Sequence, residues 1–165
     1  MKVWRERFIN AAPDAIWKLI ATVESIPLWM SSVESAEYLS GPAEGVGRMQ
    51  RLYRQLRYHL LETDQEIVSW EPGRKMSLVH RRELFRGREV SGVREFTMTL
   101  TLTEFGGSSV VRVEYRWKAS LGLSWLKSVV GGGRVMGGEL IGTLKKIGLL
   151  AGDASPKAPP PEAEE

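Results

Sequence analysis

The chain has 165 residues, 42% of them hydrophobic, and it contains no cysteine. This composition suits one domain with a full apolar core. The absence of cysteine excludes a disulfide framework, thiolate chemistry and a cysteine-ligated metal. The opening residues alternate with charges and lack the apolar run of a signal peptide, and no stretch approaches the roughly 18 apolar residues of a membrane span. The sequence therefore predicts a cytoplasmic protein with at most transient membrane contact; its oligomeric state stays open.

The formal net charge is +3, and arginines recur at every third position through Arg48, Arg51 and Arg54. On a strand, a spacing of three places successive side chains on alternate faces, so these arginines do not form one stripe for a phosphate backbone. The pattern favours a solvated sheet surface over a nucleic-acid interface. We therefore predict no nucleic-acid partner.

The first thirty residues predict a strand followed by two short helices. Apolar residues set among charges predict the strand from Lys2 to Asn10. Pro13 suits the first position of a helix, and apolar residues continue at helical spacing as far as Val23. Pro27 cannot continue that helix, so it begins either a second short helix or a tight turn.

The region from Val33 to Ala119 predicts strands throughout. Four of them run from Val33 to Ser40, Arg48 to Gln55, Leu60 to Trp70 and Arg74 to Leu84. A hairpin with strict alternation follows, and its apolar face comprises Phe96, Met98, Leu100, Leu102, Val111, Val113, Tyr115 and Trp117. Threonines and charges occupy the other face. We expect the apolar face to meet a helix and the threonines to meet water.

A long helix closes the chain, from about Leu121 to Leu150. Its apolar stripe comprises Leu126, Val129, Val130, Gly133, Met136, Gly137, Leu140, Ile141, Leu144 and Ile147. The last residues are proline, alanine and glutamate with little to bury, which predicts a disordered tail. The domain is therefore expected to span residues 1–150 and the tail residues 151–165.

This order of elements predicts an α+β domain. We expect a curved antiparallel sheet of six to seven strands that encloses a cavity together with two short helices and one long C-terminal helix. Such a cavity usually holds an apolar ligand.

Three local motifs carry a resemblance to a known superfamily. They are A-A-P-x-x-I-W from Ala11 to Trp17, P-x-W from Pro27 to Trp29, and W-E-P-G-R from Trp70 to Arg74. With the closing helix, the chain resembles over residues 2–150 the START-related helix-grip superfamily (SRPBCC), in particular its polyketide cyclase/dehydrase and lipid-transport branch. The resemblance implies a hydrophobic ligand held between sheet and helix. Members of the superfamily are cyclases or aromatases, carriers, or ubiquinone-binding proteins.

Glycines are unusually frequent in the predicted closing helix, at 131–133, 137, 138 and 142. Each costs about 0.8 to 1 kcal/mol relative to alanine inside a helix. Two interpretations stay open. In the first, the glycines are structural: they allow close packing against Tyr115 and Trp117, or they break the helix. In the second, their missing side chains widen the cavity and make the helix easier to open as a gate.

His80 is the main candidate for an acid or a base. Met76, Leu78, His80 and Arg82 alternate along one strand, and the resemblance implies that this face looks inward. The alternative is a histidine at the sheet rim that bonds a backbone carbonyl. Because His59 is the only other histidine, no metal site is predicted.

Carboxylates are not expected in the interior, since Glu62, Asp64 and Glu66 are predicted on the solvent side. Acid–base chemistry would then rely on His80 and on the remaining candidates, which are Tyr53, Arg82 and Tyr115. The stretch from Glu83 to Gly92 is either an exposed hairpin loop or a lid over the cavity.

We predict binding or transport of a small hydrophobic or amphipathic ligand: a lipid, an isoprenoid or quinone, or a polyketide-like molecule. One alternative is a cyclase or aromatase that positions a reactive polyketide chain, and the other is a protein-interaction module without a small ligand. No cofactor is predicted. The ligand is expected to enter between the loop at 83–92 and the first turns of the closing helix. The predicted ligand-binding residues are Trp29, Tyr53, Leu78, His80, Arg82, Phe96, Met98, Leu100, Val113, Tyr115, Trp117, Val130, Gly133, Met136 and Gly137.

Overall fold

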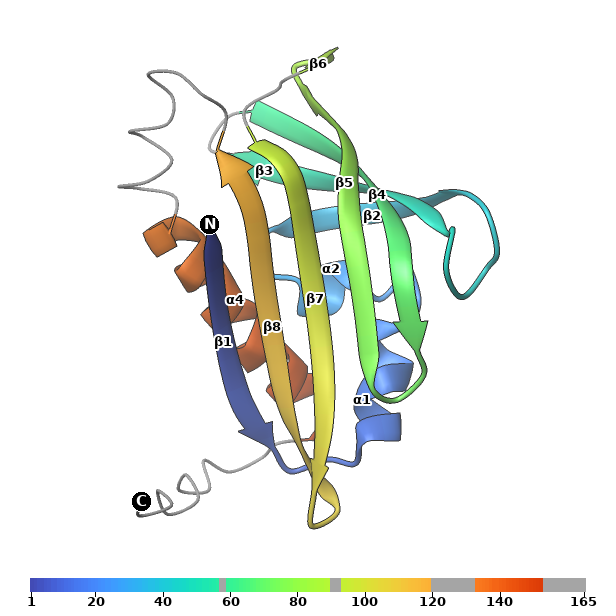
Figure 1. Cartoon of the computed structure of the whole chain (residues 1–165), viewed down its shortest axis with the longest axis vertical. Helices are drawn as coiled ribbons and strands as arrows, with labels where there is room; N and C mark the ends of the chain where they lie inside the picture. The colour runs from blue at the N-terminus through green and yellow to red at the C-terminus, as the bar shows by residue number, and fades with distance from the viewer. Residues whose placement is uncertain (57–58, 90–92, 120–132, 153–165) are drawn as a thin grey trace.

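The computed structural model describes residues 1–56, 59–89, 93–119 and 133–152. In these ranges the chain forms one antiparallel sheet, with helices on one of its faces (Figure 1). The elements in chain order are β1 (Lys2–Ile9), α1 (Pro13–Ile20), α2 (Ile26–Trp29), β2 (Val33–Ser40), β3 (Met49–Leu56), β4 (His59–Glu71), β5 (Lys75–Phe85), β6 (Arg88–Glu89), β7 (Val93–Phe105), β8 (Ser108–Ala119) and α4 (Gly133–Leu150).

The strands follow the order β1-β8-β7-β5-β4-β3-β2, and the two-residue β6 pairs with β5. The predicted α+β architecture, a curved antiparallel sheet with a C-terminal helix, is confirmed. The sheet exceeds the predicted six to seven strands by the short β6. A tight turn joins β6 to β5, because Arg86 and Gly87 have φ angles of 53° and 72°, which suit a two-residue hairpin. The stretch from Glu83 therefore begins as a hairpin; residues 90–92 lie outside the described ranges.

The hairpin of β7 and β8 has the predicted register. Met98 pairs with Tyr115 and Leu100 with Val113, and all four side chains are at most 1% exposed. The threonines of β7 lie on the opposite face of the sheet, where Thr99 bonds Ser77 of β5. The predicted inward and outward faces are therefore confirmed. Helix α1 packs over β7, whereas α4 packs over β1 and β8.

The two N-terminal helices pack against the same face of the sheet as α4 (Figure 1). Pro13 opens α1, where its missing N–H needs no partner. The indole of Trp17 meets that of Trp70 edge-on, with ring centroids 4.9 Å apart, and so joins α1 to the end of β4. Of the two alternatives at Pro27, the structure shows the short helix, which ends at the buried Trp29.

Helix α4 covers the sheet with Leu140, Leu144 and Ile147, which are buried as predicted. Ile141 is 55% exposed, so its predicted place in the apolar stripe is wrong. It follows Leu140 directly, and one residue rotates the side chain by about 100° around a helix. Residues 121–132, including Val130, and the predicted tail at 153–165 lie outside the described ranges. Within those ranges, no helix is long and apolar enough to cross a membrane.

The glycines of α4 have different surroundings. A Cβ at Gly142 would lie 3.0 Å from Cβ and Oγ of Ser31, and one at Gly137 would lie 3.2 Å from Nη2 of Arg5. Gly138 has no neighbour within 4 Å of such an atom. Close packing therefore explains Gly142 and Gly137, although the partners are Ser31 and Arg5 and not the predicted aromatic residues. It does not explain Gly138.

A β-bulge in β5 changes which side chains face the helices. Asp64 pairs with Arg82, whereas the next residue of β4 pairs with His80, so Arg81 is an extra residue in the ladder. The bulge keeps His80 on the inner face, turns Arg82 to the outer face and brings Glu83 inward. The prediction that His80 and Arg82 share a face is therefore wrong.

Candidate functional site

The interior between sheet and helices has two chemically different ends. The first, the apolar end, lies between the sheet and helices α1 and α2. It contains a cavity of about 10 Å³, which is room for about one water molecule. The residues that line the cavity are Ile20, Ile26, Trp29, Met30, Arg48, Gln50, Gln65, Met76, Leu78 and Met98. The predicted residues Trp29, Leu78 and Met98 thus border a cavity, but one nearly filled by side chains.

The second end is the polar cluster, which four strands and α4 assemble. It consists of Arg54 of β3, Thr63 of β4, His80 and Glu83 of β5, Tyr115 of β8 and Glu139 of α4. It lies toward the end of the sheet at which β3, β5 and β8 finish and β4 and β7 begin. Residues far apart in sequence therefore meet here.

Glu139 ties α4 to the rest of the polar cluster. Its Oε1 accepts hydrogen bonds from Oγ of Ser32 at 2.7 Å and from the hydroxyl of Tyr115 at 3.0 Å. Nη1 of Arg54 lies 3.7 Å from the same oxygen. Burial, reinforced by the charge of Glu139, raises the pKa of Tyr115 well above its usual value of 10. Tyr115 therefore stays a neutral hydrogen-bond donor at physiological pH.

Arg54 has unused hydrogen-bonding capacity. Its side chain is 10% exposed, and its Nε and Nη2 are buried without a hydrogen-bond partner in the described part of the chain. The hydroxyl of Thr63, on the same face of the adjacent strand, is likewise buried and unpaired there. Buried donors without acceptors are costly, and the cost is larger for a charged guanidinium. Among the described residues, the polar cluster thus leaves hydrogen-bonding capacity unused.

Both ring nitrogens of His80 and one face of its imidazole ring contact neighbouring side chains. Nε2 lies 3.0 Å from Nε2 of Gln65, Nδ1 lies 3.5 Å from Oε1 of Glu83, and the ring stacks on Phe96 at 4.1 Å. Burial lowers the pKa of His80, against the opposing effect of Glu83. A neutral ring fits these contacts, because Nε2 accepts from Gln65 and Nδ1–H points to Glu83. The predicted alternative, a rim histidine bonded to a backbone carbonyl, is not what the structure shows.

Burial alone would raise the pKa of Glu83, but the contact with His80 and the charge of Arg54 lower it overall. Glu83 is therefore ionised at neutral pH. Among the described residues, no group of three or more histidine, aspartate and glutamate side chains could hold a metal ion.

The remaining predicted site residues divide between the two faces of the sheet. The interior contains Leu100, Val113 and Trp117 in addition to those already placed. Tyr53 is on the outer face, where its hydroxyl donates to Oε1 of Glu37 at 2.8 Å, so its predicted place in the interior is wrong. Leu52, its neighbour, is the residue that points inward. In α4, Met136 packs half-buried against the core and Gly137 is buried against Arg5, while Gly133 is the first residue of the helix.

Three residues of the interior, Arg54, Glu83 and Glu139, were not among the predicted site residues. A signal existed for Arg54, because alternation from the apolar Leu52 places it on the same face. Glu83 lies beyond the β-bulge at Arg81, and no residue pattern predicts that bulge. Glu139 lies at the border of the apolar stripe of α4, where its neighbour Leu140 is fully buried.

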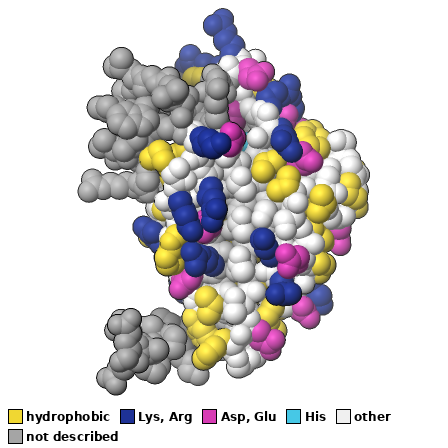
Figure 2. Space-filling view, in the orientation of Figure 1, with side chains coloured by type: hydrophobic (Ala, Val, Ile, Leu, Met, Phe, Trp, Pro, Cys, Tyr) yellow, Lys and Arg dark blue, Asp and Glu magenta, His cyan; other side chains and the backbone are white. Residues whose placement is uncertain are grey.

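The outer face of the sheet is covered by paired charges. Arg51 donates to both carboxylate oxygens of Asp64, at 2.6 and 3.1 Å, and Arg82 donates to the same carboxylate at 3.0 Å. The prediction that the arginines spaced by three lie on both faces is confirmed, since Arg48 and Arg54 point inward. Figure 2 shows basic and acidic side chains beside one another over this face, not one patch of a single sign.

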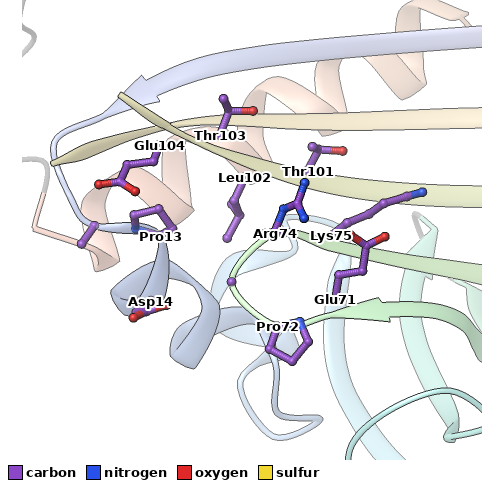
Figure 3. A pocket seen from close by; sticks show the side chains of 12 residues that line it. Pro13, Asp14, Glu71, Pro72, Arg74, Lys75, Thr101, Leu102, Thr103 and Glu104 are labelled. Atoms are coloured by element: carbon purple, nitrogen blue, oxygen red, sulfur yellow. The ribbon is translucent and has the colours of Figure 1, made fainter. Parts of the chain in front are cut away.

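A hollow of about 560 Å³ opens on the surface of the domain, between the start of α1, the turn after β4 and the end of β7 (Figure 3). Its charges are mixed: Asp14, Glu71 and Glu104 accompany Arg74 and Lys75. None of the unpaired buried polar atoms in the described residues belongs to this hollow. The polar cluster is therefore the stronger candidate site.

Of the comparisons with known proteins, the match to a family model identifies the family. The family model described as polyketide cyclase/dehydrase and lipid transport matches residues 1–147. No protein with a curated description matches the chain.

Solved structures share the fold at low sequence identity. TTHA0849 from Thermus thermophilus has a TM-score of 0.74 at 16% identity, covering 94% of this chain and 100% of that one. A START superfamily protein from Mycobacterium smegmatis has a TM-score of 0.72 at 11% identity, with 93% and 99% covered. The di-domain ARO/CYC StfQ of the steffimycin biosynthetic pathway has a TM-score of 0.74 at 12% identity, with 93% and 51% covered. At these identities the likeness shows the fold alone.

Proposed function

The chain belongs to the polyketide cyclase/dehydrase and lipid transport family, and on this premise we propose that it binds or transports a small hydrophobic or amphipathic molecule in its interior. The ligand classes that we consider are lipids, isoprenoids or quinones, and polyketide-like molecules. The head of the ligand would lie at the polar cluster.

The two donor nitrogens of Arg54 that have no partner in the described chain are the observation that carries the proposal. Its Nε and Nη2 are buried inside the domain with no acceptor among the described residues. One ligand oxygen, or two on neighbouring atoms, would satisfy both donors at once. The hydroxyl of Thr63 offers a further contact on the same inner face.

Aromatic side chains beside the polar cluster would receive the body of the ligand. The rings of Phe96 and Tyr115 lie 5.0 Å apart, and Phe96 stacks on His80. Trp117, two residues beyond Tyr115 on β8, faces the same interior and is 4% exposed. The apolar end has room for about one water molecule. The body of the ligand would therefore lie against the rings of Phe96, Tyr115 and Trp117 and not under α1.

Two measurements test the proposal. Native mass spectrometry of the purified protein shows whether a ligand is retained. Titration with decylubiquinone, followed by quenching of tryptophan fluorescence, then compares the wild type with Arg54→Gln. Because a hydrogen bond to a charged group contributes about 1.5 to 3 kcal/mol, we expect Arg54→Gln to weaken binding about tenfold or more.

Arg82→Gln is the matched control, since Arg82 lies on the outer face with a side chain that is 44% exposed. It should bind like the wild type. Equal binding by the wild type and both variants would show that Arg54 does not bind the ligand. A wild type that retains no ligand and binds no probe would favour a protein-interaction module.

A cyclase or aromatase activity is the second candidate, and the environment of His80 favours it. A neutral imidazole whose Nδ1 lies 3.5 Å from a carboxylate can act as a general base toward an enolisable ketone once the ketone displaces Gln65 from Nε2. Turnover of a linear poly-β-ketone thioester would support this activity. In that case His80→Gln should keep binding and lose turnover.

A further inference from the structure

The polar cluster holds more carboxylate than guanidinium charge. Arg54 is its one guanidinium among the described residues, and Glu83 and Glu139 supply two carboxylates. His80 does not compensate, because its burial favours the neutral ring. Arg48, which is also buried, lies at the apolar end and donates to the carbonyl oxygen of Ala21 at 2.6 Å. The polar cluster therefore carries a net negative formal charge.

Building on the proposed function, we infer that the polar cluster selects an uncharged head group, one that offers a carbonyl oxygen to Arg54 and a hydroxyl to a carboxylate, and discriminates against ligands that end in a carboxylate. A carboxylate on Arg54 would place a third negative charge beside Glu83 and Glu139. In a buried site, such repulsion is weakly screened. A ketone oxygen accepts from the same guanidinium without adding charge.

Glu83 is the acceptor best placed for the ligand hydroxyl. Its side chain is 21% exposed, and its contact with Nδ1 of His80 is long, at 3.5 Å. A carboxylate has about four acceptor positions, so this contact leaves capacity for another donor. The stack of His80 on Phe96, with planes 27° apart, and the adjoining ring of Tyr115 favour a flat aromatic head. A phenol that also carries a ketone combines these features.

Two matched probes test the inference by isothermal titration calorimetry at neutral pH. 6-Acetyl-2-naphthol and 6-hydroxy-2-naphthoic acid share the ring system and the hydroxyl group, and they differ in a ketone against a carboxylate. We expect the wild type to bind the ketone at least about tenfold more tightly than the acid. Thermal melts of each variant establish that it is folded.

Glu139→Gln removes one negative charge and keeps an amide oxygen for Ser32 and Tyr115, so we expect the preference for the ketone to shrink at least about fivefold. Glu83→Gln, at a more exposed position, should shrink it too. Glu37→Gln is the control, because Glu37 bonds Tyr53 on the outer face, and it should leave the preference unchanged.

The outcomes separate the inference from the proposed function. If the wild type binds the acid as tightly as the ketone, or more tightly, the inference is overturned while a ligand site at the polar cluster stands. A preference that both interior variants leave unchanged overturns it as well. If the wild type binds neither probe, the inference is overturned, and the decylubiquinone titration decides separately whether the proposed function stands.

Discussion

The two ends of the interior both bury polar atoms that have no partner among the described residues, but they differ in the side chains that surround those atoms. At the apolar end, Trp29, Leu78 and Met98 are at most 2% exposed and leave a cavity of about 10 Å³. In the described chain, Trp29 Nε1, Arg48 Nε and Gln50 Oε1 are buried there without a partner, and at the polar cluster the same holds for donors of Arg54 and Thr63. Such groups cost stability at both ends, and close packing around those of the apolar end leaves room for about one water molecule and not for a ligand.

The contrast also explains how α4 is held. Toward its C-terminal end, Leu144 and Ile147 are buried in the core. Nearer its N-terminal end, hydrogen bonds add to the packing of Leu140: Glu139 accepts from Ser32 and Tyr115, and Ser31 donates to the carbonyl oxygen of Glu139 at 3.1 Å. The half of α4 that borders the polar cluster therefore depends on polar contacts, which a polar ligand can replace.

The largest expected effect comes from truncation at the apolar end. Trp29→Ala should lower the free energy of unfolding by about 3 to 5 kcal/mol, because it removes a large side chain that is 2% exposed in a filled interior. Urea unfolding measures the loss. Leu28→Ala is the control, since Leu28 is 56% exposed, and it should change stability by about 0.5 kcal/mol or less.

A small loss for Trp29→Ala would contradict the assignment of this end to stability. It would mean that the apolar end relaxes easily around the missing indole, as a ligand cavity would.

Strict alternation made the strands with one dominant face predictable. In β7 and β8, Met98 and Tyr115 alternate with threonines and charges without interruption, so a shift by one residue would bury the polar set. The same rule applied to β3 would have placed Arg54 inward with Leu52. It was not decisive there, because Tyr53 is also a plausible interior residue by its chemistry alone.

The polar cluster could not be read from the sequence in full, since it depends on two features without a local pattern. The bulge at Arg81 exchanges the faces of Arg82 and Glu83 after an otherwise regular strand. Glu139 joins the cluster through tertiary packing, because α4 must first be placed over β8 before its carboxylate can reach Tyr115. Spacing along the chain specifies neither.

An intermediate effect is expected from pH, through His80 at the polar cluster. Burial lowers the pKa of His80 in the folded state, and the charges around the ring are Arg54, Glu83 and Glu139. The unfolded chain therefore takes up a proton first as the pH falls below about 6.5. Stability is full above that pH and should decline below it, by at most about 1.4 kcal/mol per pH unit.

Urea unfolding between about pH 7.5 and 5.5 measures this slope. His80→Gln should flatten it, because this substitution removes the buried imidazole. If His80→Gln leaves the slope unchanged, the ring is not held neutral in the folded protein.

The smallest expected effect distinguishes the glycines of α4 and tests whether the helix is tuned for binding. A Cβ at Gly138 meets nothing within 4 Å, so Gly138→Ala should gain about 0.8 to 1 kcal/mol of helix propensity. At Gly142 the new atom would lie 3.0 Å from Ser31, whose Oγ donates to the carbonyl oxygen of Glu139, so Gly142→Ala should gain nothing or lose stability. Thermal melts rank the two variants. The rate of decylubiquinone uptake by Gly138→Ala then shows whether this glycine helps α4 to open for the ligand. Slower uptake in a more stable protein would show that it does, and an unchanged rate would show that it does not.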